Sequence, residues 1–251
     1  MEGSVNHTLS KGIATITFYH SQSNSLPGNI LNELAERITL LGNQKDAKVI
    51  VLKSEGDRAF CAGASFDELM AIENQESGKQ FFMGFAKVIN AMRKCPKLII
   101  GRVQGKAVGG GVGMASAVDY CLATKYAAVK LSELAIGIGP FVVGPAVERK
   151  LGPSGMSQLA INATEWKSAQ WALEKGLYQD VFENIEALDE AVEELATTLT
   201  ASNPEAMSEL KQTFWQGYEH WDELLAKRAA ISGKLVLSEF TRKAIEEFKG
   251  K

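Results

Sequence analysis

The stretch that decides the fold is V-G-G-G-V-G-M-A at residues 108–115, which follows the apolar run L-I-I-G-R-V at 98–103. The apolar run predicts a buried strand, and the small residues after it predict a turn into a helix over 112–117. Glycine is costly at the start of a helix because it loses much backbone freedom on folding. Two explanations remain open for the four glycines: a ligand approaches the backbone closely, or the turn is too crowded for side chains.

Around this stretch, the first half of the chain alternates strand and helix patterns. Alternating or β-branched apolar runs predict strands at 13–19, 48–54, 97–103 and 119–124. Apolar residues at helical spacing predict helices over 29–41, over 79–94 and around Phe66, Leu69 and Met70. This alternation indicates an α/β fold with crossover connections between parallel strands.

The second half of the chain has helical patterns almost throughout. One helix is expected between the cap candidate Thr164 and the stop signal Gly176, and another around residues 192–199. Residues 205–249 continue the helical pattern. We therefore expect an α/β core over residues 1–195 and a helical region over residues 196–251.

Composition narrows the function classes. The chain has 251 residues, a formal net charge of −3 and dispersed lysines and arginines, which favours neither a nucleic-acid nor a membrane partner. Its N-terminus lacks the pattern of a signal peptide. Three widely spaced cysteines without a CxxC pair predict neither a disulfide framework nor a metal site. The expectation is a soluble, cytoplasmic protein without a metal cofactor.

Two turns rich in small residues follow two of the predicted strands: F-C-A-G-A at 60–64 and V-G-G-G at 108–111. If the strands are neighbours, both turns lie at the same end of the core. Each turn offers backbone N–H groups that no side chain obstructs, and the second lies at the start of a helix, where the dipole favours negative charge. Two such groups that converge on one point would form an oxyanion hole.

The segments R-A-F-C-A-G-A-S-F-D-E-L at 58–69 and Q-G-K-A-V-G-G-G-V-G-M-A-S-A-V-D-Y-C-L-A-T at 104–124 resemble the signature segments of the enoyl-CoA hydratase/isomerase (crotonase) superfamily. The resemblance implies a spiral of ββα units, a C-terminal helical trimerisation region and a homotrimer or a hexamer of two trimers. It also implies an acyl-CoA substrate, with coenzyme A as part of that substrate rather than as a separate cofactor. The residues that it places around the thioester are Ala62, Ala64, Ser65, Phe66, Gly109, Gly110 and Phe141.

By the same resemblance, the N–H groups of Ala64 and Gly110 hold the thioester oxygen, and Glu133 is the catalytic carboxylate. Hydratases of the family hold the attacking water between two glutamates, and Gly113 stands here at the position of one of them. A single carboxylate suffices to carry a proton between C2 and C4 of an acyl chain. The resemblance therefore favours isomerisation of a 3-enoyl-CoA to the conjugated 2-enoyl-CoA.

Phe141 agrees with this interpretation, because hydratases commonly have a small residue there whose N–H helps to place the water; its ring could equally point into the core. Two departures weaken the transfer of the binding residues. Ser65 replaces the usual aspartate of the first signature, and Asp67 stands where many members offer a lysine to the phosphates of coenzyme A.

Three other functions remain open. The first is a hydratase, acting also on branched substrates such as methylglutaconyl-CoA, that uses Glu133 alone or with Glu68 or Asp67. The second is a decarboxylase of a branched or dicarboxylic acyl-CoA, and the third is a non-catalytic binder of CoA thioesters. A serine peptidase on this architecture is disfavoured, because none of the histidines lies near a plausible nucleophile.

Overall fold

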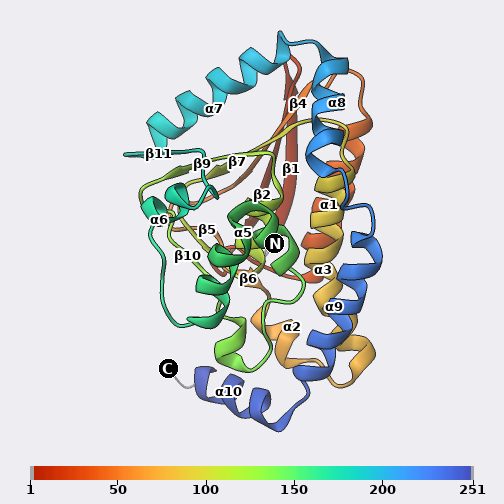
Figure 1. The fold of residues 1–251 in the computed structure, drawn as a ribbon, viewed down its shortest axis with the longest axis vertical. Coiled ribbons are helices and arrows are strands. Elements are labelled where there is room, and N and C mark those ends of the chain that lie inside the picture. The colour runs from red at the N-terminus through yellow and green to blue at the C-terminus, as the bar shows by residue number, and fades with distance from the viewer. Residues whose placement is uncertain (1–2, 250–251) are drawn as a thin grey trace.

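The computed structural model describes residues 3–249, and its centre is a six-stranded sheet (Figure 1). The first two strands are antiparallel and every later neighbour is parallel. In spatial order the strands are β1 (Gly3–Ser10), β2 (Ile13–His20), β4 (Val49–Ser54), β7 (Ile99–Val103), β9 (Tyr120–Thr124) and β11 (Asp180–Phe182).

Two smaller parallel sheets complete the core. The pair β3 (Ser25–Leu26) and β6 (Gly63–Ala64) forms one, and the other is β10 (Val129–Lys130), β8 (Lys106–Val108) and β5 (Ala59–Cys61) in spatial order. Along the chain, β2, β4, β7 and β9 of the large sheet are each followed by one or two short strands and then by a helical segment. This repeat is the spiral of ββα units that the resemblance implies, and it gathers the ends of the short strands in one place.

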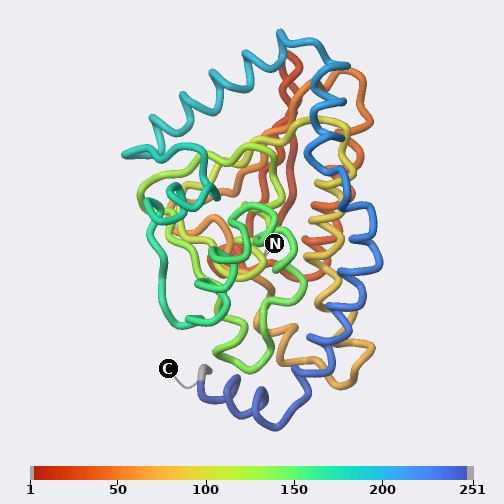
Figure 2. The backbone as a smooth tube through the Cα atoms, viewed as in Figure 1, coloured from red at the N-terminus to blue at the C-terminus, as the bar shows by residue number. Residues whose placement is uncertain are grey.

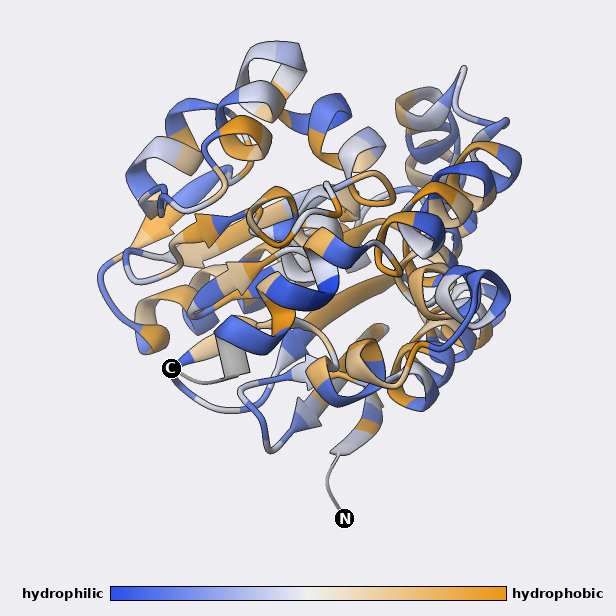
Figure 3. Cartoon of the chain, turned by 90° about the horizontal axis from the view of Figure 1, so that it is seen from below, coloured by the Kyte–Doolittle hydropathy of each residue, from blue (hydrophilic) through white to orange (hydrophobic). Residues whose placement is uncertain are grey.

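Helices cover both faces of the large sheet. One face packs on α1 (Gly28–Asn43) and α3 (Gln75–Lys94), and the other is covered by α7 (Ile185–Thr200) (Figure 1). The central strands are mostly apolar, while the outer helices carry both apolar and polar residues (Figure 3). The remaining helices are α2 (Phe66–Met70), α4 (Gly110–Ala117), the 3₁₀ turn η1 (Glu133–Ile136), α5 (Gly144–Ile161), α6 (Ala169–Glu174), α8 (Pro204–Trp215), α9 (Trp221–Leu235) and α10 (Glu239–Lys249).

The C-terminal helices run along the core rather than away from it (Figure 2). Helix α9 crosses α3 so closely that a Cβ atom built on Gly78 would lie 2.8 Å from the Cα of Gly233. A Cβ on Gly233 would lie 2.5 Å from the backbone nitrogen of Lys79. The two backbones therefore touch, and α10 then turns back against η1. None of the helices in residues 3–249 is long and apolar enough to cross a membrane.

The sequence-based expectations for strands and helices in the first half agree with the structure, with small shifts at the ends. The helix expected from Thr164 is wrong in its start: α6 begins after Ser168, whose side chain accepts a hydrogen bond from the Trp171 amide. The reason is tertiary, because Lys167 forms an antiparallel bridge with Val129 and is held extended. The expected boundary at residue 195 lies inside α7, which packs on the large sheet as far as Thr200.

Candidate active site

A cavity of about 810 Å³ lies where the short strands end. Two of its walls are the expected turns, at residues 62–64 and 108–110, and a third is formed by η1 and the segment after it. Helix α3 supplies an aromatic wall, and α10 contributes Ala244 and Glu247 to the lining. The lining includes Ala64, Phe85, Gly110, Lys130, Glu133, Phe141, Val143 and Trp166.

The two turns are in direct contact with each other. A Cβ atom on Gly111 would lie 2.5 Å from the carbonyl oxygen of Cys61, and one on Gly63 would lie 3.4 Å from the carbonyl oxygen of Val108. Gly63 also has a φ of 97°, which side chains rarely adopt. Small residues are therefore needed for the turns to approach, so crowding explains part of the glycine run.

The amide of Gly110 is the first of α4, so no carbonyl earlier in that helix can accept from it. The residue before it is fixed, because the Gly109 amide donates to the Lys130 carbonyl at 2.9 Å. On the first turn, the amide of Ser65 donates to the Leu26 carbonyl at 2.9 Å and fixes the segment around Ala64. Ala64 and Gly110 both line the cavity, as an oxyanion hole requires.

Glu133 lies beside the second turn. If Gly109 carried a Cβ atom, that atom would lie only 2.9 Å from Oε1 of Glu133, so the contact requires glycine. The φ of 51° at Gly109 independently favours glycine. The Oε2 of Glu133 is inaccessible to solvent and has no hydrogen-bond partner among the described residues, although the residue as a whole is half-buried. This desolvation raises the pKa of the Glu133 carboxyl to about 7, against a weaker opposing effect of its own backbone N–H.

The fourth glycine of the run has a different neighbour. Gly113 is buried, and a Cβ atom there would lie 2.6 Å from Cγ1 of Val143 at the start of α5. The Cδ1 of Ile89 on α3 closes the same space from another side, at 3.5 Å. The position at which a second carboxylate was considered is therefore filled by apolar side chains.

One wall of the cavity is apolar and largely aromatic. Phe81, Phe82 and Phe85 of α3 line it, and the ring of Phe85 would lie 2.2 Å from a Cβ atom on Gly110. Phe141 also lines the cavity, with its ring packed against Gly139 rather than buried in the core. The chamber is thus suited to an apolar acyl chain next to the carboxyl group of Glu133.

Of the residues implied by the family resemblance, Ala62, Ala64, Phe66, Gly109, Gly110, Glu133 and Phe141 all line the cavity. Ser65 lies apart, because its side chain accepts from the Glu68 amide and caps α2. Glu68 accepts from the Gly28 amide at 2.8 Å, and Asp67 accepts from the Gln22 side chain at 3.3 Å. Ser65, Asp67 and Glu68 line a separate hollow, so neither acidic residue faces Glu133.

Several residues of the site were not predicted. Phe85, Val143, Lys130 and Trp166 line the cavity but carry no local signal, since apolar residues on a helix look like core and a surface lysine looks solvated. The nearby thiol of Cys61 is fully buried, and burial raises its pKa to about 12, so it is not a nucleophile at neutral pH.

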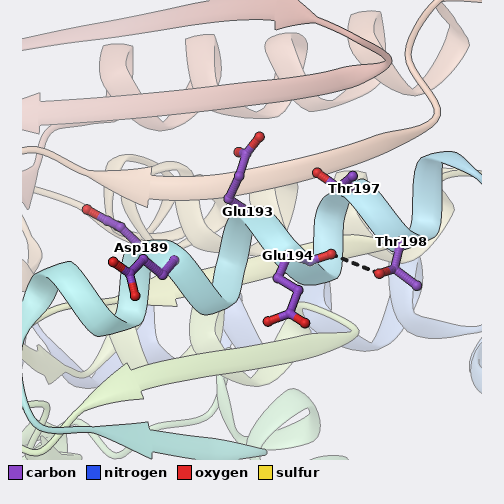
Figure 4. Close-up of a pocket in the computed structure, with 6 residues that line it drawn as sticks. Asp189, Glu193, Glu194, Thr197 and Thr198 are labelled. Carbon is purple, nitrogen blue, oxygen red and sulfur yellow. Dashed lines mark hydrogen bonds between the residues drawn. The ribbon is translucent and has the colours of Figure 1, made fainter.

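A second hollow lies on the outer side of α7 (Figure 4). All of its lining residues belong to this one helix, and the labelled carboxylates of Asp189, Glu193 and Glu194 project from it. Asp189 is engaged in an ion pair with Arg102 of β7, with an N–O distance of 2.7 Å. This acidic row is a helix surface, without groups from other elements to bind a substrate.

The shifted pKa of Glu133 predicts how stability depends on pH. Since its ordinary value is 4.5, the folded protein retains a proton between pH 4.5 and about 7 that the unfolded chain has lost. The contribution of Glu133 to the free energy of unfolding should therefore fall as the pH rises through this interval and stay constant above it. Glu133→Gln should be more stable than the unmodified protein by up to roughly 3 kcal/mol at pH 8, and similar to it at pH 4.5. Urea unfolding of both proteins across this range measures the difference, and equal stabilities at pH 8 would contradict it.

Comparison with known proteins gives one family. The sequence model described as enoyl-CoA hydratase/isomerase matches residues 8–250. The ethylmalonyl-CoA decarboxylase of Gallus gallus is 32% identical over 166 residues, which cover 64% of this chain and 55% of that protein. The short-chain-enoyl-CoA hydratase of Clostridium acetobutylicum is 27% identical over 238 residues, which cover 94% of this chain and 90% of that protein.

A crystal structure of an enoyl-CoA hydratase from Bacillus halodurans matches with a TM-score of 0.90 at 20% identity, covering 97% of this chain and 99% of that one. This likeness shows the fold. The match spans about half of the length of the ethylmalonyl-CoA decarboxylases, from 44% to 62%.

Proposed function

Since the chain belongs to the enoyl-CoA hydratase/isomerase family and has the α/β crotonase fold, we propose that it isomerises a 3-enoyl-CoA to the conjugated 2-enoyl-CoA. The family makes it an enzyme that acts on acyl-CoA substrates. The observation that carries the choice of reaction is the Glu133 carboxyl group beside the second turn, with Val143 packed against Gly113, the position at which hydratases of the family have their other glutamate.

In the proposed reaction, the amides of Ala64 and Gly110 donate hydrogen bonds to the thioester oxygen. The Glu133 carboxylate removes a proton from C2, and the electron pair of the broken C–H bond forms a dienolate whose negative charge lies on that oxygen. The same carboxyl group then returns the proton to C4, so that the C3–C4 double bond moves to C2–C3. The two amides stabilise the dienolate more than the neutral thioester, which lowers the barrier.

The pKa of about 7 suits a group that acts first as base and then as acid, because neither protonation state is strongly disfavoured at neutral pH. Hydration is less well supported. It needs water placed between two carboxylates, and the candidates Asp67 and Glu68 are engaged in another hollow.

Decarboxylation of a branched or dicarboxylic acyl-CoA is the second candidate. The similarity to the ethylmalonyl-CoA decarboxylase favours it, as does a carboxyl group that is partly protonated near neutral pH. Loss of CO₂ would leave the enolate in the oxyanion hole, and protonated Glu133 would donate its proton to C2. The family resemblance also supports a homotrimer, or a hexamer of two trimers, as the assembly that does this work.

A panel of thioesters tests the proposal. We expect the purified protein to convert a 3-enoyl-CoA to the conjugated product faster than it hydrates crotonyl-CoA or releases CO₂ from ethylmalonyl-CoA. Because Glu133 must be ionised to remove the proton, kcat/KM for isomerisation should rise with pH and level off above about 7. The ultraviolet absorbance of the conjugated thioester measures the rate. Faster hydration or faster CO₂ release would replace isomerisation as the assigned reaction.

A further inference from the structure

Two lysines lie beside one tryptophan, and one of these lysines and the tryptophan line the cavity. The Nζ of Lys106 is 4.9 Å from the centroid of the Trp166 ring, and the Nζ of Lys130 is 5.3 Å from it. Lys130 and Trp166 line the cavity, and the Trp166 side chain is 39% exposed. Both ammonium groups are thus held near the same indole, whose face attracts cations.

The backbone fixes this arrangement. Lys130 of β10 pairs with Val108 of β8, and Lys106 is two residues before Val108, so both lysines lie on one face of the small sheet. Trp166 is brought to that face because Lys167, next to it, exchanges two backbone hydrogen bonds with Val129, at 2.8 and 2.9 Å. Three separate segments therefore converge, and the same strand ends lead directly to Gly109 and the oxyanion hole.

The charges of this cluster are not compensated within it. Among residues 3–249, neither Lys106 nor Lys130 has a carboxylate within ion-pair distance, whereas the neighbouring Lys167 pairs with Glu165 at 2.9 Å. Glu133 and Glu247 line the same cavity as Lys130, but among the described residues no ion pair joins either of them to Lys106 or Lys130. An ammonium group without a carboxylate partner is stabilised by an anionic group of a ligand that binds beside it.

We propose that Lys106, Lys130 and Trp166 form an anion-binding site for the acyl-CoA substrate, which takes a carboxylate or phosphate group at the rim of the cavity. The inference rests on the proposed acyl-CoA function and adds to it a binding determinant outside the oxyanion hole and Glu133. The shared chemistry has two sources: a carboxylate at the far end of the acyl group, or the phosphates of coenzyme A. A site that selects the first would make the enzyme specific for dicarboxylic acyl groups.

Binding measured without turnover tests the site. Isothermal titration calorimetry would give Kd for four ligands: valeryl-CoA, glutaryl-CoA and the two corresponding pantetheine thioesters. Valeryl and glutaryl chains have the same length and differ by the terminal carboxylate, and the pantetheine thioesters lack the nucleotide phosphates. The variants are Lys106→Gln/Lys130→Gln and Trp166→Leu, and Lys167→Gln is the matched control because it removes a nearby charge that is already paired.

If the site takes phosphate, the double lysine variant should bind both CoA thioesters at least tenfold more weakly and both pantetheine thioesters as before. If it takes the acyl carboxylate, only the glutaryl ligands should lose affinity, with either carrier. Trp166→Leu should raise Kd for the same ligands.

Unchanged Kd values for all four ligands, or an equal loss of affinity in Lys167→Gln, would overturn the site while leaving the proposed function intact. Failure of the unmodified protein to bind any CoA thioester would overturn both. Thermal unfolding of each variant checks that it is folded.

Discussion

Glu133→Gln should lower kcat for isomerisation by about 10²–10⁴-fold, the range expected when a positioned acid–base group is removed. Glutamine has nearly the same shape, so the contact with Gly109 and the oxyanion hole are retained while the proton carrier is lost. The Kd of an unreactive CoA thioester should therefore change by no more than about twofold, because the amides of Ala64 and Gly110 are untouched. Steady-state kinetics and equilibrium titration separate the two effects.

Asp67→Asn provides the control for this prediction. A hydratase mechanism would use Asp67 as a partner of Glu133, but Asp67 accepts a hydrogen bond from the Gln22 side chain in a different hollow. The variant should keep the rate of the unmodified protein. A large loss in Asp67→Asn would revive a mechanism with two carboxylates, and full activity in Glu133→Gln would remove Glu133 from the chemistry.

Gly233→Val should destabilise the protein by about 3 kcal/mol, at the upper end of what overpacking costs. The added Cβ would lie 2.5 Å from the Lys79 nitrogen and 2.8 Å from the Gly78 carbonyl carbon, both of which belong to backbone. Since neither atom can rotate away, α9 must separate from α3. The shift of the urea midpoint at constant slope measures the loss.

Ala230→Val is the matched control, because Ala230 lies on the exposed side of the same helix. Replacing alanine by valine in a helix costs a fraction of a kcal/mol in intrinsic propensity, whereas replacing glycine by valine costs nothing, so propensity alone would make Ala230→Val the less stable variant. If both variants lost equal stability, the close crossing of α3 and α9 would not be the cause.

Much of the fold and the centre of the site could be predicted from the sequence, because both depend on short local patterns. Apolar runs fixed the strands, and the small residues that follow them fixed the turns of Ala64 and Gly110. Glu133 was found through the resemblance of its segment to a family motif. Its burial and raised pKa could not be predicted, because they come from neighbours that are distant in the sequence.

The parts that sequence reasoning missed depend on long-range packing. The sequence of α5 gives no clear helical periodicity, because Gly152 and Pro153 interrupt it. In the structure Gly152 has a φ of 71°, and the helix is kinked there. Because α5 could not be predicted from the sequence, the contact between Val143 at its start and Gly113 could not be predicted either. The start of α6 was misplaced because the bridge between Lys167 and Val129 overrides the local cap signal of Thr164.

The contact between Gly113 and Val143 has a consequence for how this chain could evolve. Acquiring a glutamate at position 113 alone would force its side chain into Val143, so the first step towards a two-acid enzyme would unsettle the protein before any new chemistry appeared. Shrinking Val143 first would open a void in the core and is itself costly. Residues 113 and 143 would therefore have to change together, and a chain with glycine and valine at these positions is expected to keep a mechanism with one carboxyl group.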